Sequence, residues 1–337
     1  MKKLLFLGLA LLMCLSLVAC SSSTETTDET NLDKLTVYFV PSRTPEEIVT
    51  ATEPLKNLLK EELAKEGYEV GEVDIQVGTT YEAVGEALSA GTADVGFIPG
   101  GTYTLYDDGA DVLLTSTRNG LSKDSSEAKD WNDGLPTEDI DGQVTYYKGL
   151  IIAGPSEKGQ ELLAKVNAGE ALTWEDLSSA KWGVRSTTSS SGYIYPSLWL
   201  NEQFDKQVSD LPSYVQTDSY GSSFAQLAAE QVDLITVYAD ARRDNADKWA
   251  ADYGQEDIWA QTGVVGVTKN IYNDTISVRN TMSQGLRDAF ANAMINIAAT
   301  DEGQEIISVY SHKGYQLANS SDYDAEREAQ KLIQDNQ

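Results

Sequence analysis

A run of hydroxyl side chains is the part of this sequence best suited to binding chemistry. Six Ser and Thr residues at 186–191 follow Arg185 and precede Gly192. The run comes after a short apolar stretch and before a segment with helical character, so its hydroxyl groups would lie beside the free N–H groups of a first helical turn. With the positive end of the helix dipole behind them, these donors would form a cradle for an anion. The alternative is a flexible Ser-rich turn that only caps the helix.

Residues suited to catalysis or metal binding are scarce. Cys14 and Cys20 lie in or next to the N-terminal apolar segment, and His312 is the only histidine. One His without Cys cannot build a typical zinc site. A Ser-His-Asp hydrolase would need His312 near the serine run, which lacks the spacing of a nucleophile elbow. Glycine-rich motifs for nucleotide phosphates are absent as well. We therefore expect a binding protein and no enzyme, with no cofactor and no metal.

The segments that must position the hydroxyl run alternate between strands and helices. Apolar stretches typical of strands occupy 35–40, 73–77, 93–98, 144–153, 182–185 and 232–238. Helical periodicity is found at 45–65, 81–90, 193–204, 224–230, 281–299 and 301–310. This order predicts an α/β fold with parallel sheets. We expect two lobes with the ligand cleft at the hinge: 35–145 and 272–337 form the first lobe, and 146–271 form the second.

The N-terminus predicts export and anchoring. Lys2 and Lys3 precede an apolar segment at 4–18, which is the order of a secretory signal peptide. The Leu-Val-Ala sequence directly before Cys20 resembles a bacterial lipobox, in which the Cys becomes the lipid-bearing first residue of the mature protein. We expect a signal peptide at 1–19, lipidation of Cys20, a disordered tether at 20–34, and a location on the extracytoplasmic face of the cell membrane. An ordinary signal peptide with an incidental Cys is the alternative.

The net charge limits the possible partners. The formal charge is −28, and loss of Lys2 and Lys3 with the signal peptide makes the mature chain more acidic still. Such a surface argues against nucleic-acid binding and against a basic membrane-docking face. It provides no long-range attraction for an anion, so an anion site must act through local dipoles.

The hydroxyl run also carries a family resemblance. Ser189, Ser190, Ser191 and Gly192, with Pro196 four residues later, resemble the S-T-S-G-x-x-x-P loop of the phosphate/phosphite/phosphonate-binding protein family of ABC transporters. The order of strands and helices matches this family over nearly the whole mature chain. The resemblance implies a two-lobed, type II periplasmic-binding-protein-like fold that closes around a small phosphonate or related oxyanion. It implies an ABC transporter permease as partner, and we expect a monomer.

The resemblance implies three tyrosine contacts with the ligand. Tyr81 and Tyr146 match tyrosines of the family cleft, with Tyr147 as the alternative if the register is shifted by one residue. Tyr220 falls where some relatives place a His that contacts the oxyanion. A phenol can donate a hydrogen bond there without the pH sensitivity of an imidazole.

Two aspartates complete the implied site. Asp240 and Asp274 fall where the 2-aminoethylphosphonate binder of the family has carboxylates for the ligand ammonium group, although Tyr272 and Ser277 depart from the family segment around Asp274. This makes 2-aminoethylphosphonate the leading candidate ligand. For both aspartates the alternative is a solvated loop carboxylate. Phosphite, phosphate, another oxyanion such as a sulfonate, or a signalling or adhesion role for the same fold are the other possibilities.

Overall fold

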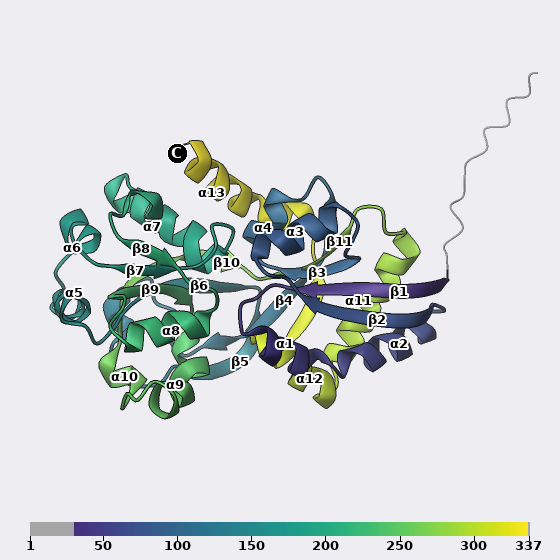
Figure 1. Ribbon diagram of the computed structural model, residues 1–337, viewed down its shortest axis with the longest axis horizontal. Helices are drawn as coiled ribbons and strands as arrows, with labels where there is room; N and C mark the ends of the chain where they lie inside the picture. Colours follow the sequence, from purple (N-terminus) through teal and green to yellow (C-terminus); the bar gives the residue numbers. More distant parts are fainter. Residues whose placement is uncertain (1–29, 336–337) are drawn as a thin grey trace, which may run out of the picture.

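The chain folds into two lobes, each built around its own β-sheet (Figure 1). The computed structural model describes residues 30–335, the last four of them as backbone only. The expected signal peptide and most of the expected tether, with Cys20, therefore lie outside the described residues. Among the helices between residues 30 and 335, none is long and apolar enough to cross a membrane.

The first lobe contains a seven-stranded mixed sheet. β1 pairs in parallel with β2 and β3, whereas β11 is antiparallel to both β3 and β4. The strands, in spatial order, are β12 (Gly314–Leu317), β4 (Ala110–Leu121), β11 (Thr275–Arg279), β3 (Val95–Ile98), β1 (Asn31–Phe39) and β2 (Glu69–Val77), with β5 (Asp139–Val144) beside β4. The antiparallel strands are β4 and β5, which precede the passage of the chain to the second lobe, and β11 and β12, which follow its return.

The second lobe contains a five-stranded sheet. β7 is parallel to β8 and β9, and β6 is antiparallel to β9 and β10. Its strands, in spatial order, are β10 (Gly263–Tyr272), β6 (Tyr146–Ala153), β9 (Leu234–Tyr238), β7 (Trp182–Val184) and β8 (Tyr214–Gln216).

Helices cover both sheets. Those of the first lobe are α1 (Pro45–Thr52), α2 (Leu55–Lys65), α3 (Tyr81–Ser89), α4 (Gly100–Leu105), α11 (Gln284–Ala298) and α12 (Asp301–Ile307). Those of the second lobe are α5 (Glu157–Asn167), α6 (Trp174–Ser178), α7 (Tyr195–Phe204), α8 (Tyr220–Ala228), α9 (Ala241–Ala251) and α10 (Ile258–Gln261). A single π-helical turn, η2 (Ser190–Ile194), precedes α7, and the described chain ends with α13 (Asp324–Asp335).

The hydrophobic core of the first lobe shows why these segments form. Leu55, Leu59 and Leu63 of α2 are buried and recur every four residues, so they form one apolar stripe along the helix. This stripe belongs to the same core as the buried Val37 and Phe39 of β1. Full burial of each such side chain stabilises the fold by about 1.5–3 kcal/mol. The lobe therefore has a core of its own on which a binding site can be built.

Several helices begin where a parallel strand ends. α1 follows β1, α3 follows β2, α8 follows β8 and α9 follows β9, while η2 and α7 follow β7. Hydroxyl side chains cap most of these starts: Thr44 caps α1, Thr80 caps α3, Ser189 caps η2 and Ser219 caps α8. In α/β sheets, ligands bind beyond the carboxyl ends of the strands because the free N–H groups of the helices point there.

The chain passes between the lobes twice through extended segments. It leaves the first lobe between β5 and β6, and it returns between β10 and β11, where Asn273 N–H donates to the carbonyl of Thr145 (2.8 Å) and so ties the two passages together. α13 then packs against both α4 of the first lobe and α7 of the second (Figure 1).

The expected fold class is confirmed, while one expected boundary differs. β1 begins at Asn31, four residues before the expected strand, because the backbone from Asn31 onward pairs with β2 from Glu69 onward. Residues 31–34 therefore belong to the sheet and not to the tether. The expected parallel pairing holds where β1 pairs with β2 and β3 and where β7 pairs with β8 and β9. The other neighbouring strands are antiparallel.

Candidate ligand-binding site

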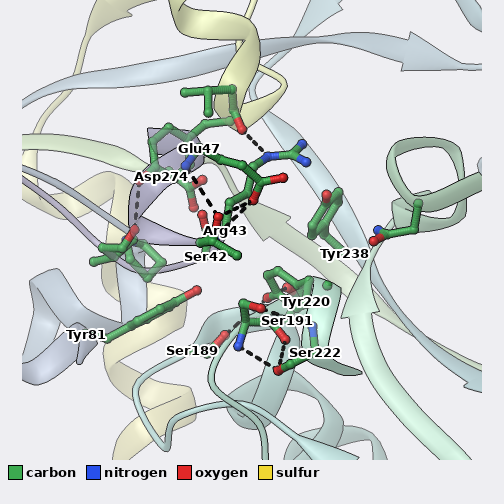
Figure 2. A pocket seen from close by; sticks show the side chains of 18 of the residues that line it. Ser42, Arg43, Glu47, Tyr81, Ser189, Ser191, Tyr220, Ser222, Tyr238 and Asp274 are labelled. Atoms are coloured by element: carbon green, nitrogen blue, oxygen red, sulfur yellow. Dashed lines mark hydrogen bonds between the residues drawn. The ribbon is translucent and has the colours of Figure 1, made fainter. Parts of the chain in front are cut away.

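A cavity of about 240 Å³ lies between the lobes (Figure 2). The first lobe contributes the segment after β1, the start of α3 and the residues around Tyr310, and the second lobe contributes the starts of η2 and α8. Of the residues expected to bind ligand, six line this cavity: Tyr81, Ser189, Ser190, Ser191, Tyr220 and Asp274.

The three serines of the loop do not point the same way. Ser189 Oγ and Ser191 Oγ lie 3.3 Å and 2.9 Å from the phenol oxygen of Tyr220, on the floor of the cavity in Figure 2. The hydroxyl of Ser190 instead donates to the buried carboxyl of Glu326 and accepts from the N–H of Gly101 (3.2 Å). Ser189 and Ser191 are thus available to an anion, and the Ser190 hydroxyl is already bonded elsewhere.

The start of α8 forms a second group of hydroxyls beside the loop. Ser219, Tyr220, Gly221 and Ser222 line the cavity, and Ser219 caps the helix. The N–H of Tyr220 donates to the carbonyl of Ser42 in the first lobe (3.2 Å), so this helix start is held against the opposite wall. Two helix starts of the second lobe, at η2 and at α8, therefore meet at one end of the cavity.

Tyrosines form much of the remaining wall. Tyr81 is the first residue of α3, is buried, and directs its hydroxyl group into the cavity in Figure 2. Burial raises its pKa, although the nearby Arg185 acts in the opposite direction. Burial likewise raises the pKa of Tyr147 and of Tyr238. These phenols therefore stay neutral at physiological pH and can donate hydrogen bonds.

The charged residues of the cavity occur as pairs. Arg118 Nη2 lies 3.1 Å from Asp274, and its guanidinium stacks 4.5 Å from the ring centre of Tyr147. Burial raises the pKa of Asp274, but the adjacent His312 and Arg118 outweigh it and hold this pKa below the usual value. Burial lowers the pKa of His312, which Asp274 only partly offsets. Asp274 is thus an ionised carboxylate that already has a cationic partner.

Further pairs join the lobes at the rim. Arg43 of the first lobe lies 3.0 Å from Asp244 of the second, and Lys248 of α9 pairs with Glu47 of α1. Burial raises the pKa of Glu47, but the bonds to Lys248 and Thr44 outweigh burial and lower this pKa to about 2. Both pairs therefore hold the start of α1 in the first lobe against α9 of the second, beside the cavity.

Tyr146 lies outside this cavity. Its hydroxyl donates to Asp124 (3.0 Å), and the side chain is half-buried in a neighbouring cavity of about 320 Å³. Tyr147, the alternative in the register, is the one that lines the first cavity. Successive residues of a strand point to opposite faces, so a shift of one residue exchanges the two positions.

Asp240 also lies outside the cavity, and its position does not fit the predicted ammonium contact. Its side chain is fully buried, where it accepts from Arg242 Nη2 (2.7 Å) and Nε (3.0 Å) and from the Thr137 hydroxyl (2.8 Å). It also caps α9 through the N–H of Arg242 (3.1 Å). The carboxylate therefore serves as the buried partner of Arg242 and has no oxygen left for a ligand.

Several cavity residues were missed from the sequence. Arg118 lies in β4, where buried Thr115, Ser116 and Thr117 hide the strand from hydrophobic periodicity. Arg43 lies in the loop between the carboxyl end of β1 and the start of α1, and a polar residue in the loop after a parallel strand was a usable signal. Among the side chains described, those of residues 30–331, no group of three or more His, Cys, Asp or Glu is placed to hold a metal ion.

A known protein family matches most of this chain. Residues 37–323 match the family model described as ABC transporter, phosphonate, periplasmic substrate-binding protein. A sequence comparison with curated proteins finds no match.

Solved structures share the fold at low sequence identity. A binding protein component of an ABC phosphonate transporter from Pseudomonas aeruginosa has a TM-score of 0.66 and 13% identity, over 90% of this chain and 88% of that one. A Xanthomonas citri protein bound to ATP has a TM-score of 0.63 and 12% identity, over 90% and 99%. PhnD1 from Prochlorococcus marinus, in complex with methylphosphonate, has a TM-score of 0.62 and 14% identity, over 90% and 98%.

Proposed function

The chain belongs to the family of periplasmic substrate-binding proteins of phosphonate ABC transporters, and from this premise we propose that its inter-lobe cavity captures a small phosphonate for an importer. The phosphonate oxygens would take hydrogen bonds from Ser189, Ser191 and Tyr220, and from Tyr81 on the opposite wall. We infer no catalytic step, because the role of the family is substrate binding.

The observation that supports this proposal is the convergence of neutral donors at two helix starts. Ser191 Oγ and Tyr220 Oη are 2.9 Å apart, and both are buried on the cavity wall. Hydroxyls and helix N–H groups stabilise an anion through hydrogen bonds and the helix dipole, so the ligand can leave again when the lobes open. A cavity of about 240 Å³ suits a ligand of a few heavy atoms.

The charge of the cavity bears on whether the ligand has an amine. Of the two carboxylates expected to hold an ammonium group, only Asp274 lines the cavity, and it pairs with Arg118 at 3.1 Å. An ammonium group would have to compete with Arg118 for it. This balance favours a phosphonate without an amine, and 2-aminoethylphosphonate stands as the alternative ligand.

A ligand panel tests the proposal. Calorimetry on the purified mature chain would compare methylphosphonate, ethylphosphonate, 2-aminoethylphosphonate, phosphite, phosphate and ethanesulfonate. We expect one of the phosphonates to bind most tightly and to raise the unfolding free energy by about 2.7 kcal/mol at a concentration of one hundred times Kd. Tightest binding of ethanesulfonate or phosphate would change the ligand class. Binding of no oxyanion at all would favour the signalling or adhesion role.

We further propose that Cys20 carries the lipid that keeps the protein at the extracytoplasmic face of the membrane, where it would deliver ligand, as a monomer, to its permease. The support is the Leu-Val-Ala-Cys sequence that closes the apolar segment and the polar residues that follow it. Cys20→Ser should release the protein from the membrane fraction, and Cys14→Ser is the matched control that should not. If Cys20→Ser stays in the membrane fraction, the anchor lies elsewhere.

A further inference from the structure

Arg185 is a buried cation without an acidic partner. It directly follows β7, and the whole residue is 2% exposed. Its guanidinium donates to two backbone carbonyls, through Nη2 to Pro41 of the first lobe (3.0 Å) and through Nη1 to Thr217 of the second. Its Nε has no hydrogen-bond partner, and no carboxylate among residues 30–331, whose side chains the structure describes, forms an ion pair with it.

The guanidinium lies directly behind the candidate site. It is 5.4 Å from the ring centre of Tyr81 and 5.2 Å from that of Tyr220, and both tyrosines line the cavity. The serine loop wraps around the stem of the side chain: Arg185 N–H donates to the Gly192 carbonyl (3.1 Å), and a Cβ on Gly192 would lie only 2.4 Å from the Arg185 Cβ and Cγ. The charge is therefore held at a fixed distance from the cavity.

The other cations in and around the cavity are each neutralised. Their pairs are Arg118 with Asp274, Arg43 with Asp244, Lys248 with Glu47, and the fully buried Arg242 with Asp240. Arg185 is thus the cation of this group that has no carboxylate partner, and the Glu82 carboxylate of α3 bonds instead to the hydroxyls of Ser186 and Thr188. Burial of a charge without a partner is costly, and in folded proteins such a charge is normally matched by a carboxylate or by a ligand.

We propose that Arg185 determines the charge preference of the site: its counter-charge is the bound oxyanion, so the cavity selects a doubly charged ligand over a singly charged one of the same shape. The inference rests on the proposed function and identifies which charge state is bound. The interaction of a fixed cation with an anion scales with the anion charge, so a phosphonate dianion gains twice what a sulfonate gains. The hydroxyl donors contact either ligand and would discriminate less.

The test compares methylphosphonate with methanesulfonate, which have similar tetrahedral shapes and differ in charge. In the unmodified protein, the affinity for methylphosphonate should fall by about tenfold per pH unit below the second ionisation of the ligand, because only the dianion binds well. The affinity for methanesulfonate should stay constant over the same range. Arg185→Gln should lower the ratio of the two affinities by tenfold or more, which is about 1.4 kcal/mol, and should flatten the pH profile. Arg185→Lys, which keeps the charge, should largely preserve the ratio.

The control is the double variant Asp240→Asn/Arg242→Gln, which removes another buried guanidinium together with its partner. It should leave the ratio and the pH profile unchanged. An unchanged ratio in a folded Arg185→Gln protein overturns the inference. If that variant does not fold, equal affinity of the unmodified protein for methylphosphonate and methanesulfonate overturns it instead. If the unmodified protein binds neither compound, the proposed function itself fails.

Discussion

The hydroxyl group of Ser190 donates its hydrogen bond to the carboxyl group of Glu326, 136 residues further along the chain. Glu326 belongs to α13, and its side chain is buried beside Gly101, where a Cβ would lie 3.1 Å from the Glu326 Oε1. The middle hydroxyl of the serine loop therefore fixes the loop to the C-terminal helix, while its neighbours Ser189 and Ser191 point to the cavity. Residues that look equivalent in the sequence have different tasks.

The first prediction separates these tasks. Ser189→Ala and Ser191→Ala should each weaken binding of the best phosphonate by about 1–3 kcal/mol, because a ligand oxygen is then buried without its donor. Ser190→Ala should lower the free energy of unfolding and change the affinity less than either neighbour does. Calorimetry and chemical unfolding of the three variants measure both quantities. If Ser190→Ala weakens binding as much as the others with unchanged stability, its hydroxyl reaches the ligand.

The second prediction concerns pH. Burial raises the pKa of Glu326 from 4.5 to about 7, although bonds to Ser190 and Tyr195 act the other way. Because the folded pKa is the higher one, the stability contributed by protonated Glu326 is complete below about pH 4.5 and is lost as the pH rises through 7. The full loss is roughly 3 kcal/mol. Glu326→Gln does not ionise, so its stability relative to the unmodified protein should increase by up to that amount between pH 4.5 and 8.

Urea unfolding at several pH values checks this, with Glu82→Gln as control. Glu82 also bonds to hydroxyls of the serine loop, Ser186 and Thr188, but its pKa is lowered, with burial outweighed by those bonds. Its substitution should therefore not relieve a loss of stability at high pH. A parallel pH dependence of Glu326→Gln and the unmodified protein would show that Glu326 is not the titrating group.

The third prediction contrasts the two aspartates. Asp240→Asn leaves Arg242 as an unpaired buried charge and should destabilise the protein by about 3–5 kcal/mol, without changing the preference between ethylphosphonate and 2-aminoethylphosphonate. Asp274→Asn removes a negative charge from the cavity wall and should strengthen phosphonate binding, because Arg118 is then free to face the anion. If the unmodified protein prefers 2-aminoethylphosphonate over ethylphosphonate and Asp240→Asn loses this preference, the Asp240 carboxylate reaches the ligand.

The fourth prediction concerns closure. The Arg43–Asp244 pair joins the lobes, and its side chains are only 23% and 28% exposed. A double-mutant cycle with Arg43→Met and Asp244→Asn should give a coupling to ligand binding of about 0.2–1 kcal/mol that decreases with added salt. Lys269 and Glu202 form a matched pair within the second lobe, 72% and 45% exposed, and their substitution should leave binding unchanged. Equal coupling for both pairs would exclude a contribution of Arg43–Asp244 to closure.

The parts of the fold that follow hydrophobic periodicity could be predicted. The buried strands β1 and β9 and the apolar stripe of α2 were all visible in the sequence. β4 was missed because hydroxyl residues occupy its buried positions, and α9 was missed because Arg242 and Asn245 occupy buried positions on that helix. Where polar side chains satisfy one another inside the protein, the apolar pattern that identifies an element is lost.

The site could be predicted only as far as local sequence controls it. The serine loop and its helix start depend on neighbouring residues, and the structure brings Ser189, Ser191, Tyr81 and Tyr220 together around one cavity. The partner of Asp240 is two residues away but depends on how α9 packs, and the partner of Ser190 lies in another helix altogether. Such pairings are set by tertiary packing, which spacing along the chain does not reveal.

The position of α13 across both lobes changes how freely they can move. Two extended passages alone would allow the lobes to bend and to twist about the axis between them. A helix that packs on α4 and α7 at once, with Gln330 bonded to the Gly101 carbonyl, acts as a third connection and opposes the twist. An open form so guided has fewer orientations to lose on closing, so less of the ligand binding energy is spent on ordering the lobes.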